Sequence, residues 1–477
     1  MANISRRHVL AGLGTAGFAT SISSLSGLGF NDAWAADTSG YKAMICIFLK
    51  GGMDGADTLL PFDEQSYGQL RSVRSNLFAS YQHESENSTR NRANLLPLNF
   101  ENASDLGGRQ FALPRELTPL HSMFNGGDLA VVGNVGPLIE PTTRQSMDAG
   151  TAILPKRLFS HNDQQSTWMS FGVEGIRHGW GGRFMDQIVA SNPNQNRVFS
   201  AISATANDVF LAGQDVTQFK VATGGVVREP HLYANHSYLG TTREFDAPRA
   251  KIREFLSRQD FQNDSVFEQD FASLTARAVR NSESFAEAKA QGTPFNTQFP
   301  KTLLSNQLRS VAETIKVHPF LNVSRQMFYC SMGGFDTHSN QSESISRGHL
   351  ELAEAISAFR NAMIEIGEWD NVVVFTASDF GRTLIDNGNG TDHGWGGHQI
   401  VAGGQVRGKW LYGEIPEPEV RSEAYTKSRG RLIPTTSVEQ YAATMGSWFG
   451  LDKSELNVAM PNLSNFRDAD LGFMGGV

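Results

Sequence analysis

Short, wholly apolar runs that are followed by glycine or an acid constrain the fold of this chain more than any other feature. Three of them are Ala43–Leu49, Leu129–Val132 and Val372–Phe375. A strand with no polar residue on either face is buried on both, as the central strands of parallel sheets are. A helical run, Leu117–Phe124, precedes the second of them, and this helix-then-strand order is typical of a parallel sheet. We therefore expect a mostly parallel α/β sheet.

The N-terminus carries the pattern of an export signal. The segment SRRHVL, residues 5–10, resembles a twin-arginine signal, and a Gly/Ala/Ser-rich stretch runs from Val9 to Phe30. Ala33-Trp34-Ala35 supplies small residues at the two positions that a signal peptidase recognises. The stretch is too polar and too rich in glycine to remain as a membrane-spanning helix. We expect the twin-arginine machinery to export the chain, residues 1–35 to be removed, and the mature protein to be periplasmic.

Composition excludes other classes of protein. The formal net charge of −8 provides no basic field for binding nucleic acid. The two cysteines, Cys46 and Cys330, both lie inside apolar runs, which predicts buried thiols and neither a disulfide framework nor a cysteine zinc site. We expect residues 36–477 to form a single large α/β domain with insertions at about 63–110 and 205–300.

Acids follow three of the predicted strands. They are Asp54 after Ala43–Leu49, Asp336 after Arg325–Met332, and Asp379 after Val372–Phe375. Ligands of open α/β sheets bind beyond the carboxyl ends of the strands. His338 lies two residues past Asp336, so both side chains point to one side of an extended segment. His393 and His398 follow Asp379 in a glycine-rich stretch.

This set of residues predicts a metal site. Unpaired buried carboxylates would cost several kcal/mol each, so acids that cluster need a neutralising charge. One or two divalent cations would supply it, and mixed Asp/His ligation suits zinc or manganese better than calcium. Two metals could activate a nucleophile and stabilise the leaving oxygen of an ester. The alternative for each motif taken alone is an ordinary turn or a polar surface loop.

Ser160 is the candidate nucleophile. It precedes a polar run that leads to Trp168, and a helix start there would offer backbone N–H groups to an anion. The alternative is that Ser160 is simply a helix N-cap. Thr143, in Pro-Thr-Thr-Arg, is a rival hydroxyl. Arg382 and Arg144 could bind phosphate or sulfate oxygens bidentately, or could instead pair with an acid such as Asp392.

Six segments together carry a resemblance to a known family. They are FLKGGMDGADTL, LAVVGNVGPL, LFSHNDQQSTW, GGFDTHSNQ, VVVFTASDFGRT and DHGWGGHQIVAGG. Over most of residues 40–450 the chain resembles the bacterial exported proteins grouped as the domain of unknown function 1501 family. That family is similar in layout to the alkaline-phosphatase-like superfamily of phosphatases, sulfatases and phosphomutases. The resemblance implies a doubly wound, mostly parallel sheet with helices on both faces and metals at the strand ends.

The same resemblance implies roles for individual residues. Asp54 matches the first metal-binding acid, and Ser160 matches a nucleophile at a helix start. Asp336 and His338 match an acid–histidine pair, and Asp379 matches the acid that follows. Either His393 or His398 matches a late histidine.

The chain also departs from the superfamily pattern. The superfamily usually has an Asp-His pair where this chain has Asp379-Phe380, and its acid–histidine spacing is usually wider than in Asp336-Thr337-His338. Two functions stay open. One is an exported metal-dependent hydrolase of small phosphate or sulfate esters. The other is a catalytically inactive relative that binds a ligand or an envelope partner in the same cleft.

Overall fold

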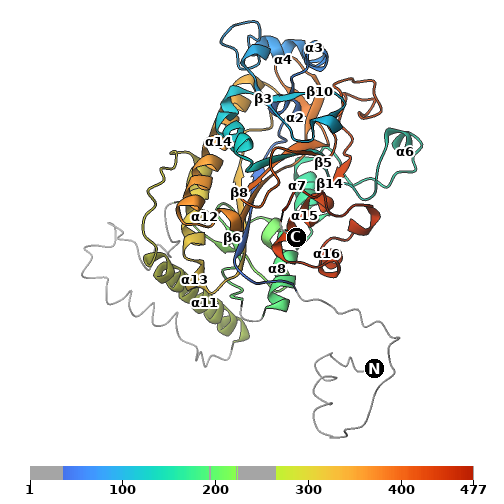
Figure 1. The fold of residues 1–477 in the computed structure, drawn as a ribbon. Coiled ribbons are helices and arrows are strands. Elements are labelled where there is room, and N and C mark those ends of the chain that lie inside the picture. The colour runs from blue at the N-terminus through green and yellow to red at the C-terminus, as the bar shows by residue number, and fades with distance from the viewer. Residues whose placement is uncertain (1–35, 193–194, 222, 224–264, 476–477) are drawn as a thin grey trace, which may run out of the picture. The chain divides into compact units, whose positions relative to one another are not determined.

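A mostly parallel sheet forms the centre of the computed structural model (Figure 1), which describes residues 36–192, 195–221, 223 and 265–475. In the described residues the strand order is β13-β5-β12-β9-β1-β8-β6-β7, with β14 beside β5. The strands are β1 (Lys42–Leu49), β5 (Leu129–Gly136), β6 (Ala201–Ser203), β7 (Phe219–Lys220), β8 (Arg325–Met332), β9 (Val372–Ser378), β12 (Gly397–Gly403), β13 (Leu411–Tyr412) and β14 (Thr436–Ser437). The expected export signal at residues 1–35 lies outside the described ranges.

Strand directions confirm the predicted sheet with one exception. β1 pairs in parallel with β8 on one side and with β9 on the other. β12 is antiparallel to both β5 and β9, so it is a reversed strand inside a parallel arrangement. The run Leu129–Val132, expected in a parallel context, therefore has an antiparallel neighbour in β12, although it is parallel to β13 and β14.

Helices cover both faces of the sheet, as a doubly wound fold requires. Ile45, Ile47 and Leu49 of β1 pack in one core with α5 (Thr118–Gly126), α12 (Leu303–Lys316) and α14 (Gln341–Glu365). The alternate residues Met44, Cys46 and Phe48 pack in a second core with α7 (His161–Ser170), α8 (Trp180–Ser191), α15 (Val438–Phe449) and α16 (Lys453–Ala459). Side chains of a strand point alternately to its two faces, so an all-apolar strand serves both cores.

The two predicted insertions differ in how much of them is described. Residues 60–113 contain α3 (Glu64–Val73), α4 (Ser75–Ser80) and a small sheet in the order β2-β4-β3, built from Leu60–Pro61, Phe111–Leu113 and Leu96–Leu98. In the second region, β7 and α11 (Val266–Ala290) are described, whereas residues 222 and 224–264 lie outside the described ranges. Cys46 and Cys330 are buried free thiols, as predicted.

Further short elements connect the larger ones. They are α2 (Gly55–Thr58), α6 (Arg144–Asp148), α13 (His318–Leu321), β10 (Arg382–Asp386) and β11 (Thr391–His393). The described residues from Ala36 to Gly475 belong to one compact unit. Across the described ranges, no helix combines the length and the apolar character that crossing a membrane requires.

The three central strands end at one level. Leu49, the last residue of β1, pairs with Met332 of β8 and with Ser378 of β9. The segments that carry Asp54, Asp336 and Asp379 therefore leave the same edge of the sheet. Gly51 lets the segment after β1 approach the segment after β8 closely. Its φ is +117°, and a Cβ on it would lie 2.2 Å from the backbone nitrogen of Asp336.

Candidate metal centre

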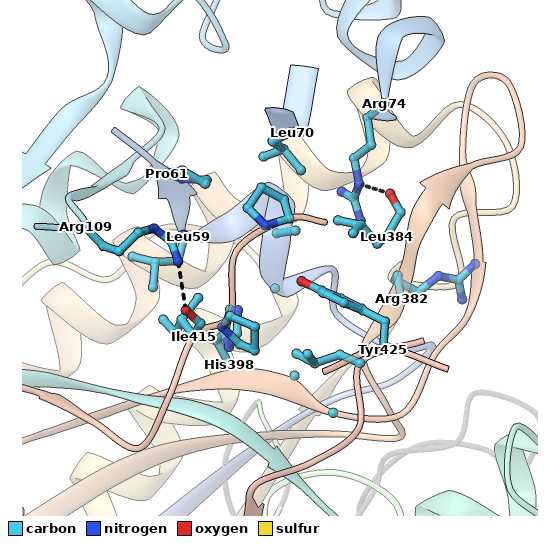
Figure 2. A pocket seen from close by; sticks show the side chains of 17 residues that line it. Leu59, Pro61, Leu70, Arg74, Arg109, Arg382, Leu384, His398, Ile415 and Tyr425 are labelled. Carbon is cyan, nitrogen blue, oxygen red and sulfur yellow. Dashed lines mark hydrogen bonds between the residues drawn. The ribbon is translucent and has the colours of Figure 1, made fainter. Parts of the chain in front are cut away.

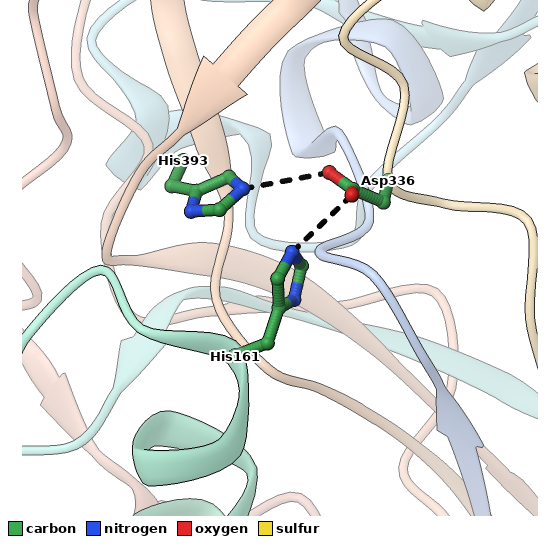
Figure 3. Close-up of side chains that lie close together, drawn as sticks. All are labelled: His161, Asp336 and His393. Atoms are coloured by element: carbon green, nitrogen blue, oxygen red, sulfur yellow. Dashed lines mark ion pairs between the residues drawn. The ribbon is translucent and has the colours of Figure 1, made fainter.

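Three imidazoles surround the carboxylate of Asp336, just beyond the end of β8. The Nε2 atom of His338 lies 3.1 Å from Oδ1 of Asp336, and that of His393 lies 3.5 Å from the same oxygen. The Nε2 atom of His161 lies 3.4 Å from Oδ2 (Figure 3). His161 begins α7 and His393 ends β11, so three distant segments meet at this acid.

Each of these imidazoles is held at its other ring nitrogen by an oxygen. Nδ1 of His161 lies 2.6 Å from Oδ2 of Asp379, and Nδ1 of His338 lies 3.1 Å from Oδ1 of Asp392. Nδ1 of His393 lies 2.8 Å from the backbone carbonyl oxygen of Phe159. An oxygen acceptor requires the proton on Nδ1, which leaves Nε2 as the atom that faces Asp336. Metal-binding histidines are oriented in this way.

The arrangement fits a divalent cation. Nε2 of His161 is buried, and no atom in the described part of the chain forms a hydrogen bond with it. The Nε2 atoms of His338 and His393 lie only 2.8 Å apart, and with both protons on Nδ1 their lone pairs would repel. The ligand atoms of His161, Asp336 and His393 all lie within 4.8 Å of one another. A donor set of imidazoles and one carboxylate suits zinc or a similar transition metal.

The protonation states of the histidines depend on their separate surroundings. The hydrogen bond to Asp379 raises the pKa of His161 above its usual value, against the opposing effect of burial. Burial lowers the pKa of His338, and the charge of Arg382 lowers it further. Burial also lowers the pKa of His393. His338 and His393 are therefore neutral at pH 7 and able to act as ligands, whereas a metal at His161 would replace a proton that Asp379 favours.

Arg382, a predicted anion-binding cation, is instead the partner of Asp336. Its Nη1 atom lies 3.0 Å from Oδ1 of Asp336 and donates to the carbonyl oxygen of Gly51 at 3.0 Å. Nη2 donates to the carbonyl oxygen of Thr391, and the side chain is fully buried. Burial raises the pKa of Asp336, but its hydrogen bond and charge interaction with Arg382 outweigh this and lower the pKa below its usual value. The carboxylate is therefore ionised at neutral pH.

Asp54 reaches the same sheet edge but has a cation of its own. Arg74, which directly follows α3 in the polar insertion, donates from Nη1 to Oδ2 at 2.8 Å and from Nη2 to Oδ1 at 3.1 Å. Gln341 also donates to Oδ2, at 2.8 Å, and the backbone N–H of Ala56 donates to Oδ1. Both side chains of the ion pair are 1% exposed. The charge of Asp54 is thus neutralised by a bidentate guanidinium, separately from the imidazole cluster.

His398 lies apart from the cluster, beside a small cavity of about 40 Å³ (Figure 2). The backbone N–H of Asn134 donates to its Nδ1 at 3.1 Å, and burial, with a smaller effect of Arg109, lowers its pKa to about 4. Arg109 and Tyr425 line the same cavity, together with Arg74. His398 is consequently a neutral hydrogen-bonded side chain here, with Nε2 as its donor.

Ser160 lies at the start of α7, directly before His161, as its helix-start motif predicted. Its hydroxyl donates to Oδ2 of Asp163 at 3.0 Å and makes no capping hydrogen bond to the helix backbone. The rival Thr143 caps α6 in a reciprocal arrangement with Ser146. Ser160 is therefore one residue from the cluster, whereas Thr143 serves the end of another helix.

Arg144, the second predicted anion-binding cation, is engaged elsewhere. It donates to the backbone carbonyl oxygens of Arg421 and Ser422 and forms an ion pair with Glu423. Arg144 therefore holds the loop that follows β13.

One family model decides the relationship of the chain to known proteins. The model described as "Protein of unknown function (DUF1501)" matches residues 41–468. This chain belongs to the DUF1501 family. A search of curated protein sequences gave no match.

Comparison with solved structures gave distant likenesses. Ps i-CgsB shares 8% identity over 89% of this chain and 77% of that chain, with a TM-score of 0.36. The zinc complex of the C-terminal periplasmic domain of EcEptC from Escherichia coli shares 8% identity over 87% and 85%, with a TM-score of 0.34. BT1596, a 2-O GAG sulfatase, shares 9% over 87% and 71%, with a TM-score of 0.27. All three scores are below 0.5, so the fold is assigned from the strand order above.

His161 of this DUF1501 protein is a site residue that is absent from the predicted set. It lies in the segment LFSHNDQQSTW, in which Ser160 is the predicted functional residue. A usable signal was present: His161 and Gln165 are four residues apart, the spacing of one helix face, and Gln165 also donates to Oδ2 of Asp379 at 2.8 Å. The partner Asp379 lies 218 residues from His161, and local sequence cannot indicate that pairing.

Proposed function

We propose that this protein is an exported, metal-dependent hydrolase of small phosphate or sulfate esters that acts in the periplasm. The observation that carries the proposal is the set of three imidazoles, each anchored at Nδ1, that present Nε2 to the carboxylate of Asp336. Within the predicted ligand set, Asp336, His338 and His393 lie at the centre, and His161 joins them. These residues would hold one or two divalent cations, zinc or manganese by ligand chemistry.

The other predicted ligands take supporting positions in this proposal. Asp379 orients His161, Asp54 is held by Arg74, and His398 accepts a backbone hydrogen bond. Arg382 keeps Asp336 ionised beside the metal. All of these roles stay predictions until metal content is measured in variants.

In this proposal the hydroxyl of Ser160 is the nucleophile, and the groups around it activate it. A bound divalent cation would lower the pKa of a hydroxyl and stabilise the leaving oxygen of an ester. Asp163, 3.0 Å from the Ser160 hydroxyl, is placed to accept its proton. The backbone N–H groups at the start of α7 would stabilise negative charge that develops next to Ser160.

A second candidate function is binding without turnover. Phe380 occupies the position at which the superfamily usually has a second histidine. Its ring centroid lies 4.9 Å from that of His161 and 4.6 Å from that of His393, so an apolar ring packs against two of the imidazoles. A centre with one ligand fewer could hold a metal and an anion without activating a nucleophile.

Metal analysis of the mature protein, purified after export, tests the proposal. We expect close to one or two equivalents of zinc or manganese in the wild type and loss of metal in Asp336→Asn and His161→Ala. Glu64→Gln is a matched control, because Glu64 is an exposed carboxylate on α3. Turnover of a panel of phosphate and sulfate esters then separates the two candidate functions. A wild type that contains no metal under any growth condition would contradict both.

A further inference from the structure

Arg431 touches two residues of the candidate site. Its Nε–H donates to the backbone carbonyl oxygen of His393 at 2.9 Å, and its guanidinium carbon lies 4.1 Å from the centroid of the Phe159 ring. Phe159 in turn accepts the hydrogen bond from Nδ1 of His393 and directly precedes Ser160. Arg431 therefore contacts the backbone of one residue of the imidazole cluster and the ring of the residue that precedes the candidate nucleophile.

The backbone around Arg431 holds it in place. The N–H of Thr426 donates to the carbonyl oxygen of Arg431 at 2.9 Å, and the N–H of Arg431 donates back to the Thr426 hydroxyl at 3.2 Å. These two bonds close a tight turn. A side chain fixed in this way loses less conformational entropy when it binds a ligand.

Arg431 differs from the other cations around the centre in having no acidic partner. Arg382 pairs with Asp336, Arg429 with Asp392, and Arg157 with Asp163. For Arg431, the described part of the chain offers neither a carboxylate within ion-pair distance nor a hydrogen-bond partner for Nη1 or Nη2.

The geometry of the guanidinium defines what it can bind. The Phe159 ring covers one face of the guanidinium, and Nε–H donates to the carbonyl oxygen of His393. The edge formed by the two Nη groups is therefore the part that is available to a ligand. That edge presents two roughly parallel N–H donors, which match two oxygens of a phosphate or sulfate group. A carboxylate would fit the same edge, but a metal centre next to a hydroxyl favours the tetrahedral groups.

We propose that Arg431 binds the tetrahedral oxyanion of the ligand beside the metal centre. The nature of that ligand, a phosphate or sulfate ester, rests on the proposed function, whereas oxyanion binding by Arg431 can be tested without turnover. Arg431 then takes the role that the sequence suggested for Arg382 and Arg144, both of which are engaged within the protein.

The test is calorimetric binding of inorganic phosphate, and separately of inorganic sulfate, to the metal-loaded mature protein. Arg431→Met keeps an unbranched apolar chain over Phe159 and removes the N–H donors. Arg431→Lys keeps the positive charge but lacks the pair of parallel Nη donors. Arg347→Met is the control, since Arg347 lies on α14 with a side chain that is 71% exposed. Metal content and the thermal unfolding midpoint are measured for every variant.

We expect the Kd of the preferred anion to rise about 10- to 100-fold in Arg431→Met and by less in Arg431→Lys, with metal content unchanged and no effect in the control. Comparing the two anions shows which ester class the site favours. Unchanged affinity in Arg431→Met, or no binding of either anion to the wild type, would overturn the inference. So would parallel loss of metal and anion, because Arg431 would then only support His393. Weakened anion binding in a protein that hydrolyses no ester would keep the inference and remove the hydrolase.

Discussion

Nδ1 of His161 lies 2.6 Å from Oδ2 of Asp379, although the two residues are 218 positions apart in the chain. Asp379 is fully buried at the end of β9 and also accepts hydrogen bonds from Gln165 and from the backbone N–H of Gly51. A carboxylate fixed by the sheet thus sets the orientation of an imidazole on a helix. This pairing explains why Nε2 of His161 points at Asp336.

Asp379→Asn should weaken metal binding without removing a ligand. The amide keeps the size of the side chain but loses the charge that raises the basicity of His161, and changes of this kind typically cost 10- to 100-fold in metal affinity. Competition with a chelator of known zinc affinity measures the effect. Glu64→Gln, an exposed carboxylate change, should have no effect. Equal affinities in wild type and Asp379→Asn would show that the pair does not act on the metal.

Asp54→Asn should destabilise the fold and leave the metal in place. The substitution leaves the buried guanidinium of Arg74 without its counter-charge, which typically costs about 3–5 kcal/mol. Urea unfolding gives the free energy, and metal analysis of the same samples gives the occupancy. The double variant Asp54→Leu with Arg74→Met should recover part of the stability, because no unpaired charge remains. Loss of metal at normal stability would instead make Asp54 a ligand, as the sequence predicts.

His398 should make the protein less stable in acid. Its folded-state pKa of about 4 lies below the ordinary value of 6.5, so the unfolded chain binds the proton first as the pH falls. Stability from this group is complete above pH 6.5 and is lost on going down to pH 4, by about 3 kcal/mol. In His398→Asn the amide oxygen can still accept from Asn134, and this part of the pH dependence should disappear. Urea unfolding of metal-free protein at pH 7 and pH 4.5 measures the difference.

Local sequence patterns were sufficient to predict the framework of the site. Wholly apolar runs identified β1, β5 and β9, because a strand buried on both faces favours apolar residues at every position. The two-residue spacing of Asp336 and His338 predicted that their side chains share one side, and their polar atoms lie 3.1 Å apart. The acids after β1, β8 and β9 were expected at one sheet edge, and the strand register places those segments there.

Partners from distant segments could not be predicted. Arg74 lies in the polar insertion, where no sequence motif indicates a site residue, yet it neutralises Asp54. The reversed direction of β12 was missed for a related reason: an apolar run has the same composition whichever way it enters the sheet. Both depend on how remote parts of the chain pack together, which hydrophobic periodicity does not encode.

The export signal can be tested independently of the fold. Replacing Arg6 and Arg7 together by lysine should leave uncleaved protein in the cytoplasm, because the pair is the recognised part of the twin-arginine pattern. Cell fractionation and the mass of the N-terminus measure the outcome. Changing Arg71 and Arg92 to lysine, far from the signal, is the control. Normal amounts of mature periplasmic protein from the Arg6/Arg7 variant would mean that another route exports the chain.

Ser160 separates an enzyme from a binding protein, so its substitution is the most informative about function. A hydroxyl is a weak nucleophile until a metal or a base activates it, and Asp163 at 3.0 Å is the base placed to do so. If the protein hydrolyses phosphate or sulfate esters, Ser160→Ala should lower kcat by at least about a thousandfold, with metal content and thermal unfolding unchanged.

Thr143→Ala is the matched control for Ser160→Ala, because Thr143 also begins a helix but only caps it. It should keep full activity and lose at most about 2 kcal/mol of stability from the missing cap. If Thr143→Ala loses turnover and Ser160→Ala keeps it, the nucleophile is misassigned while the class of hydrolase stands. If both variants match the wild type in turnover, the attacking group is neither hydroxyl, and a water molecule at the metal centre becomes the nucleophile to test.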